Sequence, residues 1–200
     1  MAPHFILEAL NIDFELILVN RQTNAHKSNE YLALNPSGRI PTLIDEQLVL
    51  FESAAICIHL AESNPSARFI PNIGSKNRAK FFQWMMYLTN TVQAEFMFYF
   101  YPNRHTNSSN ALANMTLIQE ERITNMFGLL DNELRHKVFL IGNIITACDF
   151  FLFMLAIWAN EFKKPPLAFT HLSKYLCNLA KNDAIINVCK KENVNIDNYQ

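Results

Sequence analysis

Two short segments, taken together, constrain this chain more than any other feature. The first, Asn35–Pro41 (Asn-Pro-Ser-Gly-Arg-Ile-Pro), predicts a turn that leads into an apolar strand, since its first proline and its glycine are turn residues. A proline is tolerated at the start of a strand, and the Ile40–Pro41 bond is of the type that can be cis. The second, Phe51–Ile56, opens a helix with Glu-Ser. An extended peptide ligand can therefore pair with the backbone at Ile40 and place a carboxylate at Ser53, where helix N–H groups favour an anion.

Each segment alone has a simpler explanation, because Asn-Pro-Ser-Gly is a common turn and a serine before a helix is a common N-cap. The ordered combination resembles the N-terminal, thioredoxin-like domain of the glutathione transferases, whose pattern is Asn-Pro-x-Gly-x-Val/Ile-Pro-x-Leu and then Glu-Ser-x-Ala-Ile. In that family the residue before the cis-proline pairs with the cysteinyl backbone of glutathione, and the Glu-Ser pair binds its γ-glutamyl end. The resemblance therefore implies a glutathione-binding site at Arg39, Ile40, Pro41, Glu52 and Ser53.

A second match lies far downstream. Phe139–Gly142 (Phe-Leu-Ile-Gly) is followed by Ile145–Asp149 (Ile-Thr-Ala-Cys-Asp) and then by an apolar run. Thr146 and Asp149 have the spacing of a capping box, in which each side chain satisfies a free N–H at the other position. The same family carries Phe-Leu-x-Gly…Ser/Thr-x-Ala-Asp at the start of a buried helix of its C-terminal domain. The resemblance makes Thr146 and Asp149 structural residues, with no part in the chemistry.

The predicted elements divide into an α/β unit and an all-helical unit. In the first we expect helices over 2–10, 29–34 and 53–63, a buried strand over Phe14–Val19, and a hairpin of Thr42–Ile44 and Leu48–Phe51. In the second we expect helices over 78–100, 112–135 and 146–160, and two shorter ones after Pro165-Pro166. The resemblance implies a thioredoxin-like domain over 1–64, a linker over 65–76, and an all-helical C-terminal domain over 77–200.

The first strand of the family's thioredoxin-like domain has no counterpart in the sequence. The opening Ala2-Pro3-His4 resembles part of the Cys-Ser-Leu-Ala-x-His stretch of bacterial, beta-class-like members, which follows that strand. In the family this strand lies in the middle of the sheet, so its neighbours would be about 10 Å apart, twice the spacing of paired strands. We therefore expect an incomplete sheet, with Phe14–Val19 separated from Thr42–Ile44 or drawn in to pair with it, and a truncated gene model whose native form starts upstream.

The catalytic residue cannot be assigned within this sequence. A transferase must hold glutathione as a thiolate, which the family does with a Tyr, Ser or Cys just after its first strand, so the resemblance places this residue upstream of Ala2. Alignment through Trp84 puts Met86 and Gln93 where beta-class-like members carry an Asn and a His. The end of this helix lines the family's cleft for the apolar co-substrate, which makes Tyr99, Tyr101 and Gln93 candidates for that cleft.

Composition narrows the class of protein. The chain has 17 lysines and arginines and 18 aspartates and glutamates, and the two signs of charge are evenly mixed along it. Nothing therefore indicates nucleic acid or an anionic membrane as a partner. The longest apolar run, Phe150–Ala159, is too short to cross a bilayer. Isolated cysteines without a secretory segment indicate reduced thiols and a cytoplasmic location, and the histidines show no metal-binding spacing. The cysteines are Cys57, Cys148, Cys177 and Cys189.

The sequence thus predicts a cytoplasmic, homodimeric glutathione transferase-like protein that attaches the glutathione thiolate to small hydrophobic electrophiles and uses no metal. Two alternatives remain open at this point. One is a catalytically silent relative that uses the same fold for binding or regulation. The other is a glutathione-dependent disulfide reductase, which would need a cysteine in the loop after the first strand.

Overall fold

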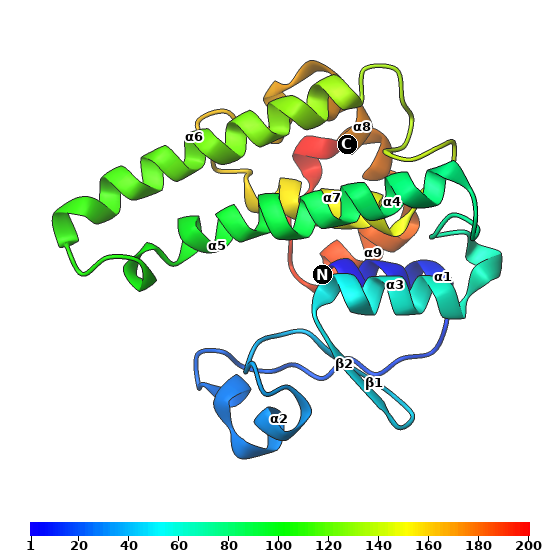
Figure 1. The fold of residues 1–200 in the computed structure, drawn as a ribbon, viewed down its shortest axis with the longest axis horizontal. Helices are drawn as coiled ribbons and strands as arrows, with labels where there is room; N and C mark the ends of the chain where they lie inside the picture. Colours follow the sequence, from blue (N-terminus) through cyan, green and yellow to red (C-terminus); the bar gives the residue numbers. More distant parts are fainter.

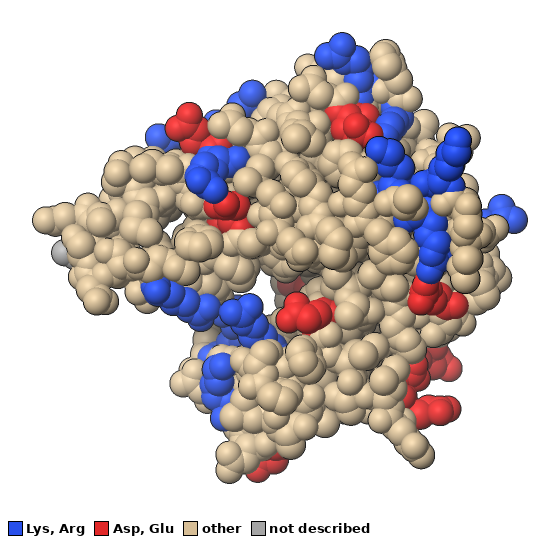
Figure 2. All heavy atoms as spheres, viewed as in Figure 1, with Lys and Arg blue, Asp and Glu red and all other residues tan. Residues whose placement is uncertain are grey.

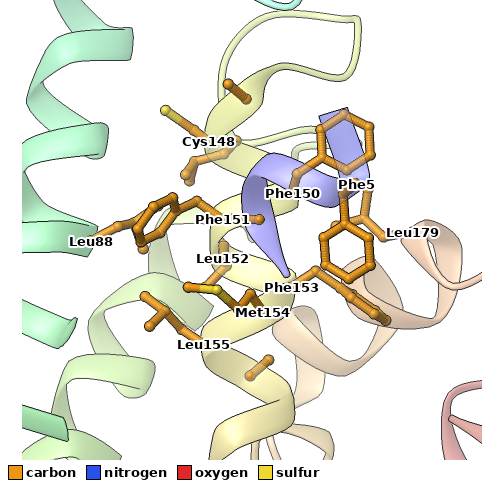
Figure 3. Close-up of a cluster of buried hydrophobic side chains, with 14 of the residues drawn as sticks. Phe5, Leu88, Cys148, Phe150, Phe151, Leu152, Phe153, Met154, Leu155 and Leu179 are labelled. Carbon is orange, nitrogen blue, oxygen red and sulfur yellow. The ribbon is translucent and has the colours of Figure 1, made fainter. Parts of the chain in front are cut away.

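Helix α7 (Ala147–Trp158) is the centre of the hydrophobic core in the computed structural model, which describes residues 1–200 except for the side chain at position 109. Every residue from Ala147 to Ala156 is buried, as expected of a helix that is apolar on all sides. Figure 3 shows its side chains pointing both ways, Phe151 toward Leu88 and Phe150 toward Phe5. Phe5 lies 6.2 Å from Phe150, measured between ring centroids. Helix α7 therefore holds the N-terminal helix and the long helices together.

The other elements surround this helix (Figure 1). The strands are β1 (Thr42–Asp45) and β2 (Leu48–Phe51), which form an antiparallel hairpin with Thr42 opposite Phe51. The remaining α-helices are α1 (Ala2–Leu10), α2 (Asn29–Leu34), α3 (Ser53–Ser63), α4 (Lys76–Met86), α5 (Ala94–Phe100), α6 (Ser109–Glu133), α8 (Thr170–Leu179) and α9 (Asp183–Lys191). No helix in the described part of the chain is long and apolar enough to cross a membrane.

Helices α1 and α3 lie side by side between the hairpin and α7 (Figure 1). Pro3 occupies the first turn of α1, where its missing N–H costs nothing, and Asn11 ends the helix in the left-handed conformation. On the hairpin side, His59 of α3 contacts Asp45 of β1, with 2.9 Å between Nε2 and Oδ2. This contact fixes α3 against the hairpin that precedes it.

The prediction of a buried strand over Phe14–Val19 is wrong. The segment forms no strand, and Leu16, Ile17 and Leu18 are 59, 70 and 90% exposed. An extended segment is buried in a sheet only if a neighbouring strand accepts its backbone hydrogen bonds, and in the described residues only β1 and β2 pair with each other. The expected incomplete sheet is thus observed: among the described residues it consists of the hairpin alone, and Phe14–Val19 does not pair with it.

The long helix predicted over residues 78–100 is present with an interruption. Helices α4 and α5 are joined by a π-helical segment, Tyr87–Gln93, and the three form one rod that runs beside α6 (Figure 1). A π-helical segment accommodates an extra residue within a helix. Phe96 anchors α5, with its ring centroid 5.6 Å from Trp158 of α7 and 6.3 Å from Phe127 of α6.

The start of α7 has a capping box formed by Thr146 and Asp149. The Asp149 Oδ2 atom accepts hydrogen bonds from the Thr146 N–H at 2.6 Å and from the Thr146 hydroxyl at 2.7 Å. Its Oδ1 atom accepts from the Leu140 N–H at 2.8 Å and from the Tyr175 hydroxyl at 2.6 Å. Burial raises the pKa of Asp149, and these hydrogen bonds oppose that effect. The buried carboxyl group of Asp149 therefore joins α7 to α8 and to the loop that precedes α7.

Candidate functional site

The loop between α2 and β1 is held by two side chains that the sequence analysis did not select. Asn35 is buried, and its Nδ2 donates to the Arg39 carbonyl at 2.7 Å and to the Thr42 hydroxyl at 3.2 Å. Its Oδ1 accepts from the Ser37 N–H at 3.1 Å, which closes the turn. The Tyr31 hydroxyl donates to the same Arg39 carbonyl at 2.7 Å. These side-chain hydrogen bonds, together with the backbone bond from the Gly38 N–H to the Asn35 carbonyl (2.9 Å), hold the loop up to Arg39.

Gly38 is the one position in this loop where glycine is required. Its φ is +58°, and a Cβ atom there would lie 2.5 Å from Lys27 Nζ and 3.1 Å from the His26 carbonyl oxygen. The left-handed conformation disfavours a side chain, and the His26 backbone carbonyl leaves little space for one, although the flexible end of Lys27 can shift. The glycine of the sequence motif thus allows the chain to turn beside the short helix that precedes α2.

The backbone of Ile40 is available to a ligand. The Ile40–Pro41 bond is cis, as the sequence predicts, and the Ile40 side chain is 46% exposed. Its N–H and C=O form no hydrogen bond within the described part of the chain. An extended residue with free backbone groups at the end of a strand can pair with a peptide by adding to the sheet.

The hairpin register places Glu52 and Ser53 beside this free backbone. Because Thr42 pairs with Phe51, Pro41 and Glu52 are the next residues outward at the same end of the hairpin. Glu52 has a φ of +72°, a conformation that few non-glycine residues adopt, and Ser53 is the half-buried first residue of α3. The first N–H groups of α3 have no partner within the helix, and the Ser53 hydroxyl forms no hydrogen bond among the described residues. The arrangement can hold a carboxylate.

Arg39 is exposed, and its side chain takes part in no ion pair in the part of the chain that the structure describes. Two of the cavities in the described part of the chain have volumes of about 370 and 350 Å³. The first lies between α1, residues 11–16 and α9, and the second lies between residues 68–77 and 141–146. Neither is lined by Ile40 or Ser53, so a shared pocket for these two residues stays a prediction.

The two tyrosines predicted to line the co-substrate cleft point in different directions. Tyr99 packs on Phe162, with 4.8 Å between ring centroids, and burial together with the Glu120 charge raises its pKa. Tyr101 follows α5, and its hydroxyl accepts a hydrogen bond from Arg21 of the α/β unit. Gln93 is half-buried at the end of the π-helical segment. Tyr101 is thus the candidate that the structure brings to the α/β unit.

The buried thiols are poor nucleophiles. Burial raises the pKa of Cys57 and of Cys148, and it raises that of Cys189 to about 11. A raised pKa keeps a thiol protonated at neutral pH, whereas the thiolate is the reactive form. Among the described residues there is also no group of three or more His, Cys, Asp or Glu side chains placed to hold a metal ion.

A small α/β unit with a cis-proline loop, followed by an all-helical unit, is the architecture expected from the two sequence signatures, and comparison with known proteins agrees. The family model described as the glutathione S-transferase N-terminal domain matches residues 1–62, and that of the C-terminal domain matches residues 89–183. The glutathione S-transferase GST-4.5 of Xanthomonas campestris pv. campestris is 25% identical over 161 residues, which cover 80% of this chain and 78% of that protein.

Solved structures extend the match to nearly the whole chain. A sphingomonad glutathione S-transferase in complex with glutathione is 26% identical, with a TM-score of 0.83 over 97% of this chain and 94% of that one. The beta class glutathione S-transferase of Sphingomonas chungbukensis is 25% identical, with a TM-score of 0.84 and the same coverage. The chain belongs to the glutathione S-transferase superfamily, a family of transferase enzymes, and it is similar to the bacterial beta class.

Proposed function

We propose that this protein binds glutathione at the open end of the β1–β2 hairpin and joins glutathione, through its thiolate sulfur, to small hydrophobic electrophiles. The observation that carries the proposal is the hairpin register, which brings the free backbone of Ile40 and the N-terminus of α3 at Ser53 to one end of the sheet. A γ-glutamyl tripeptide has an extended backbone and a terminal carboxylate, which these two groups complement. The related sphingomonad enzyme was solved with glutathione bound.

Each proposed binding residue has a separate task. The backbone of Ile40, held beside Pro41, pairs with the cysteinyl residue of glutathione. Glu52 and Ser53 bind the γ-glutamyl end, where the Ser53 hydroxyl and the free N–H groups of α3 donate to the carboxylate. Arg39 is exposed beside them and supplies positive charge. We assign glutathione binding to these residues and do not assign to them the activation of its thiol.

We further propose that residues 1–64 and 77–200 act as two domains joined by a linker over 65–76, and that the protein works as a homodimer in the cytoplasm. The free cysteines support the cytoplasmic location, since unpaired thiols are typical of a reducing compartment. The apolar co-substrate would lie against the end of α5, where Gln93, Tyr99 and Tyr101 are the candidates to contact it.

A second candidate function, glutathione binding without catalysis, is favoured by one observation. Tyr31 is the tyrosine that contacts the loop between α2 and β1, and its hydroxyl forms hydrogen bonds with the Arg39 carbonyl and the Thr42 hydroxyl. It is therefore not free to donate to a glutathione thiolate. A disulfide reductase finds no support in the buried thiols, because burial raises the pKa of Cys57 and Cys148.

The replacement Ser53→Ala tests the proposed binding site. We expect the dissociation constant for glutathione, measured by calorimetry, to rise by about tenfold, since a hydrogen bond to a charged carboxylate contributes about 1–3 kcal/mol. Ser63→Ala, at the exposed C-terminal end of the same helix, is the matched control and should leave the affinity unchanged. Equal affinities for the protein and both variants would rule out Ser53 as a ligand of glutathione.

A further inference from the structure

Two arginines from distant parts of the sequence meet at one tyrosine. Arg104, in the turn after α5, places its guanidinium carbon 4.1 Å from the centroid of the Tyr101 ring. Arg21, which follows the unpaired segment 14–19, has its guanidinium carbon 5.8 Å from the same centroid and donates a hydrogen bond to the Tyr101 hydroxyl. A guanidinium group on an aromatic ring is attracted by the π electrons and keeps N–H groups free for a ligand.

In the described part of the chain, neither of these positive charges forms an ion pair with a carboxylate. The two arginine ion pairs in the described part of the chain are Arg78 with Glu62 and Arg122 with Glu95. The distances to Tyr101 place the guanidinium carbons of Arg21 and Arg104 no more than about 10 Å apart, comparable with the Debye length of about 8 Å at physiological salt. Salt screens much of the repulsion between exposed charges that far apart, but an anion bound next to Tyr101 would lie close to both guanidinium groups.

The contact spans the opening between the α/β unit and the long helices. Figure 2 shows a hollow between the lower and upper parts of the molecule, with Lys and Arg atoms gathered along one side and acidic atoms on the other. The Arg21–Tyr101 hydrogen bond joins a loop of the lower part to the end of α5. Because the Tyr101 hydroxyl accepts from Arg21, its own hydrogen remains free to donate. Two guanidinium groups and one phenol thus offer donors to the same ligand.

We propose that Arg21, Tyr101 and Arg104 form a subsite for a carboxylate on the acceptor substrate, so that the protein prefers apolar electrophiles that carry an acid group. This inference rests on the proposed function, because it defines the substrate class of the cleft next to the glutathione site. The apolar part of the substrate would lie against the end of α5, where Phe98, three residues before Tyr101, is exposed. The carboxylate would accept hydrogen bonds from the guanidinium groups, and the geometry of a guanidinium matches a carboxylate.

The test compares ligands that differ only in the acid. S-(4-carboxybenzyl)glutathione and S-benzylglutathione form the first pair, and 1-naphthoate and 1-naphthamide form a second pair without glutathione. Calorimetry should show the acid of each pair binding about three- to tenfold more tightly than its neutral partner, a range set by exposed charged hydrogen bonds. This advantage should shrink as salt rises from about 0.05 M to about 0.5 M, because exposed charges are screened.

The variants Arg21→Gln and Arg104→Gln should each reduce the preference for the acid, and the double variant should abolish it. Arg104→Lys should keep part of the preference, since the charge remains. Arg135→Gln removes the same charge from an exposed arginine after α6 and should change nothing. Thermal unfolding of every variant checks that a lost preference does not come from a damaged fold.

The outcomes separate the subsite from the glutathione site. If the arginine variants weaken both members of the glutathione pair equally, the arginines bind the carboxylate of glutathione itself and the proposed subsite is wrong. It is also wrong if neither pair shows a preference for the acid. If neither glutathione derivative binds, the proposed function fails, and the naphthoate pair alone then decides whether the arginines form an anion site.

Discussion

Helix α7 and the segment Phe14–Val19 are both runs of apolar residues, yet the molecule places them in opposite environments. The residues of α7 from Ala147 to Ala156 are all buried, while Leu16, Ile17 and Leu18 are exposed. A helix satisfies its backbone hydrogen bonds internally, so packing side chains against it is sufficient to bury it. An extended segment needs a second strand for its backbone, and Phe14–Val19 has none among the described residues. Hydrophobicity alone therefore does not determine burial, because the backbone must also be satisfied.

The largest expected effect lies in α7. Phe151→Ala removes a fully buried ring that points toward Leu88 (Figure 3). We expect the free energy of unfolding, measured by urea denaturation, to fall by about 3–5 kcal/mol, from lost burial and the cavity that remains. A loss below about 1 kcal/mol would show that the core around α7 is loosely packed, and it would contradict the contrast drawn between α7 and Phe14–Val19.

The second effect concerns the loop between α2 and β1, whose conformation depends on backbone geometry more than on packing. Gly38→Ala forces a Cβ atom into a left-handed position beside Lys27. We expect a loss of about 1–2 kcal/mol in unfolding free energy, together with weaker binding of glutathione in calorimetry. Gly74→Ala is the control, since Gly74 also has a positive φ (+82°) but its added Cβ would contact nothing. If only Gly38→Ala affects glutathione binding, the loop conformation is what the ligand requires.

A third prediction concerns pH and the contact between α1 and the end of α9. Burial opposes the charge of Glu192, but the hydrogen bond from His4 (2.8 Å) and the Met1 amino group outweigh it and lower the pKa of Glu192. A lowered folded-state pKa stabilises the protein above the unfolded value of about 4.3, and this stability is lost as the pH falls through the folded value. Thermal unfolding between about pH 6 and pH 3 should thus depend less on pH in Glu192→Gln. Identical pH profiles would refute this contribution.

The smallest effect is expected at Leu18, the most exposed of the apolar residues in the unpaired segment. Leu18→Ser should change the unfolding free energy by no more than about 0.5 kcal/mol, because the side chain buries almost no surface. Exposed apolar patches promote association, so the variant should be more soluble, which sedimentation after concentration would measure. A loss comparable with that of Phe151→Ala would mean that Leu18 is buried in solution.

Local features of the structure were predictable from the sequence, and contacts between distant residues were not. Gly38, the hairpin and the capping box of Thr146 and Asp149 depend on neighbours a few residues away, so their residue types indicate them directly. Whether Phe14–Val19 forms a buried strand depends on whether another strand lies beside it, and its own residues do not reveal this. The meeting of Arg21 with Tyr101 joins residues 80 positions apart, and no spacing rule indicates it.

The central claim is that glutathione binds between Ile40 and Ser53, at the open end of the β1–β2 hairpin and away from the core around α7. Hydrogen exchange of the backbone amides, measured with and without saturating glutathione, tests it most directly, since it reports on each segment separately. We predict slower exchange in the segments around Ile40 and the first turn of α3, with no change in α7 beyond the stabilisation shared by the whole chain. Slower exchange only in other segments, such as those that line the cavity between α1 and α9, would contradict the account.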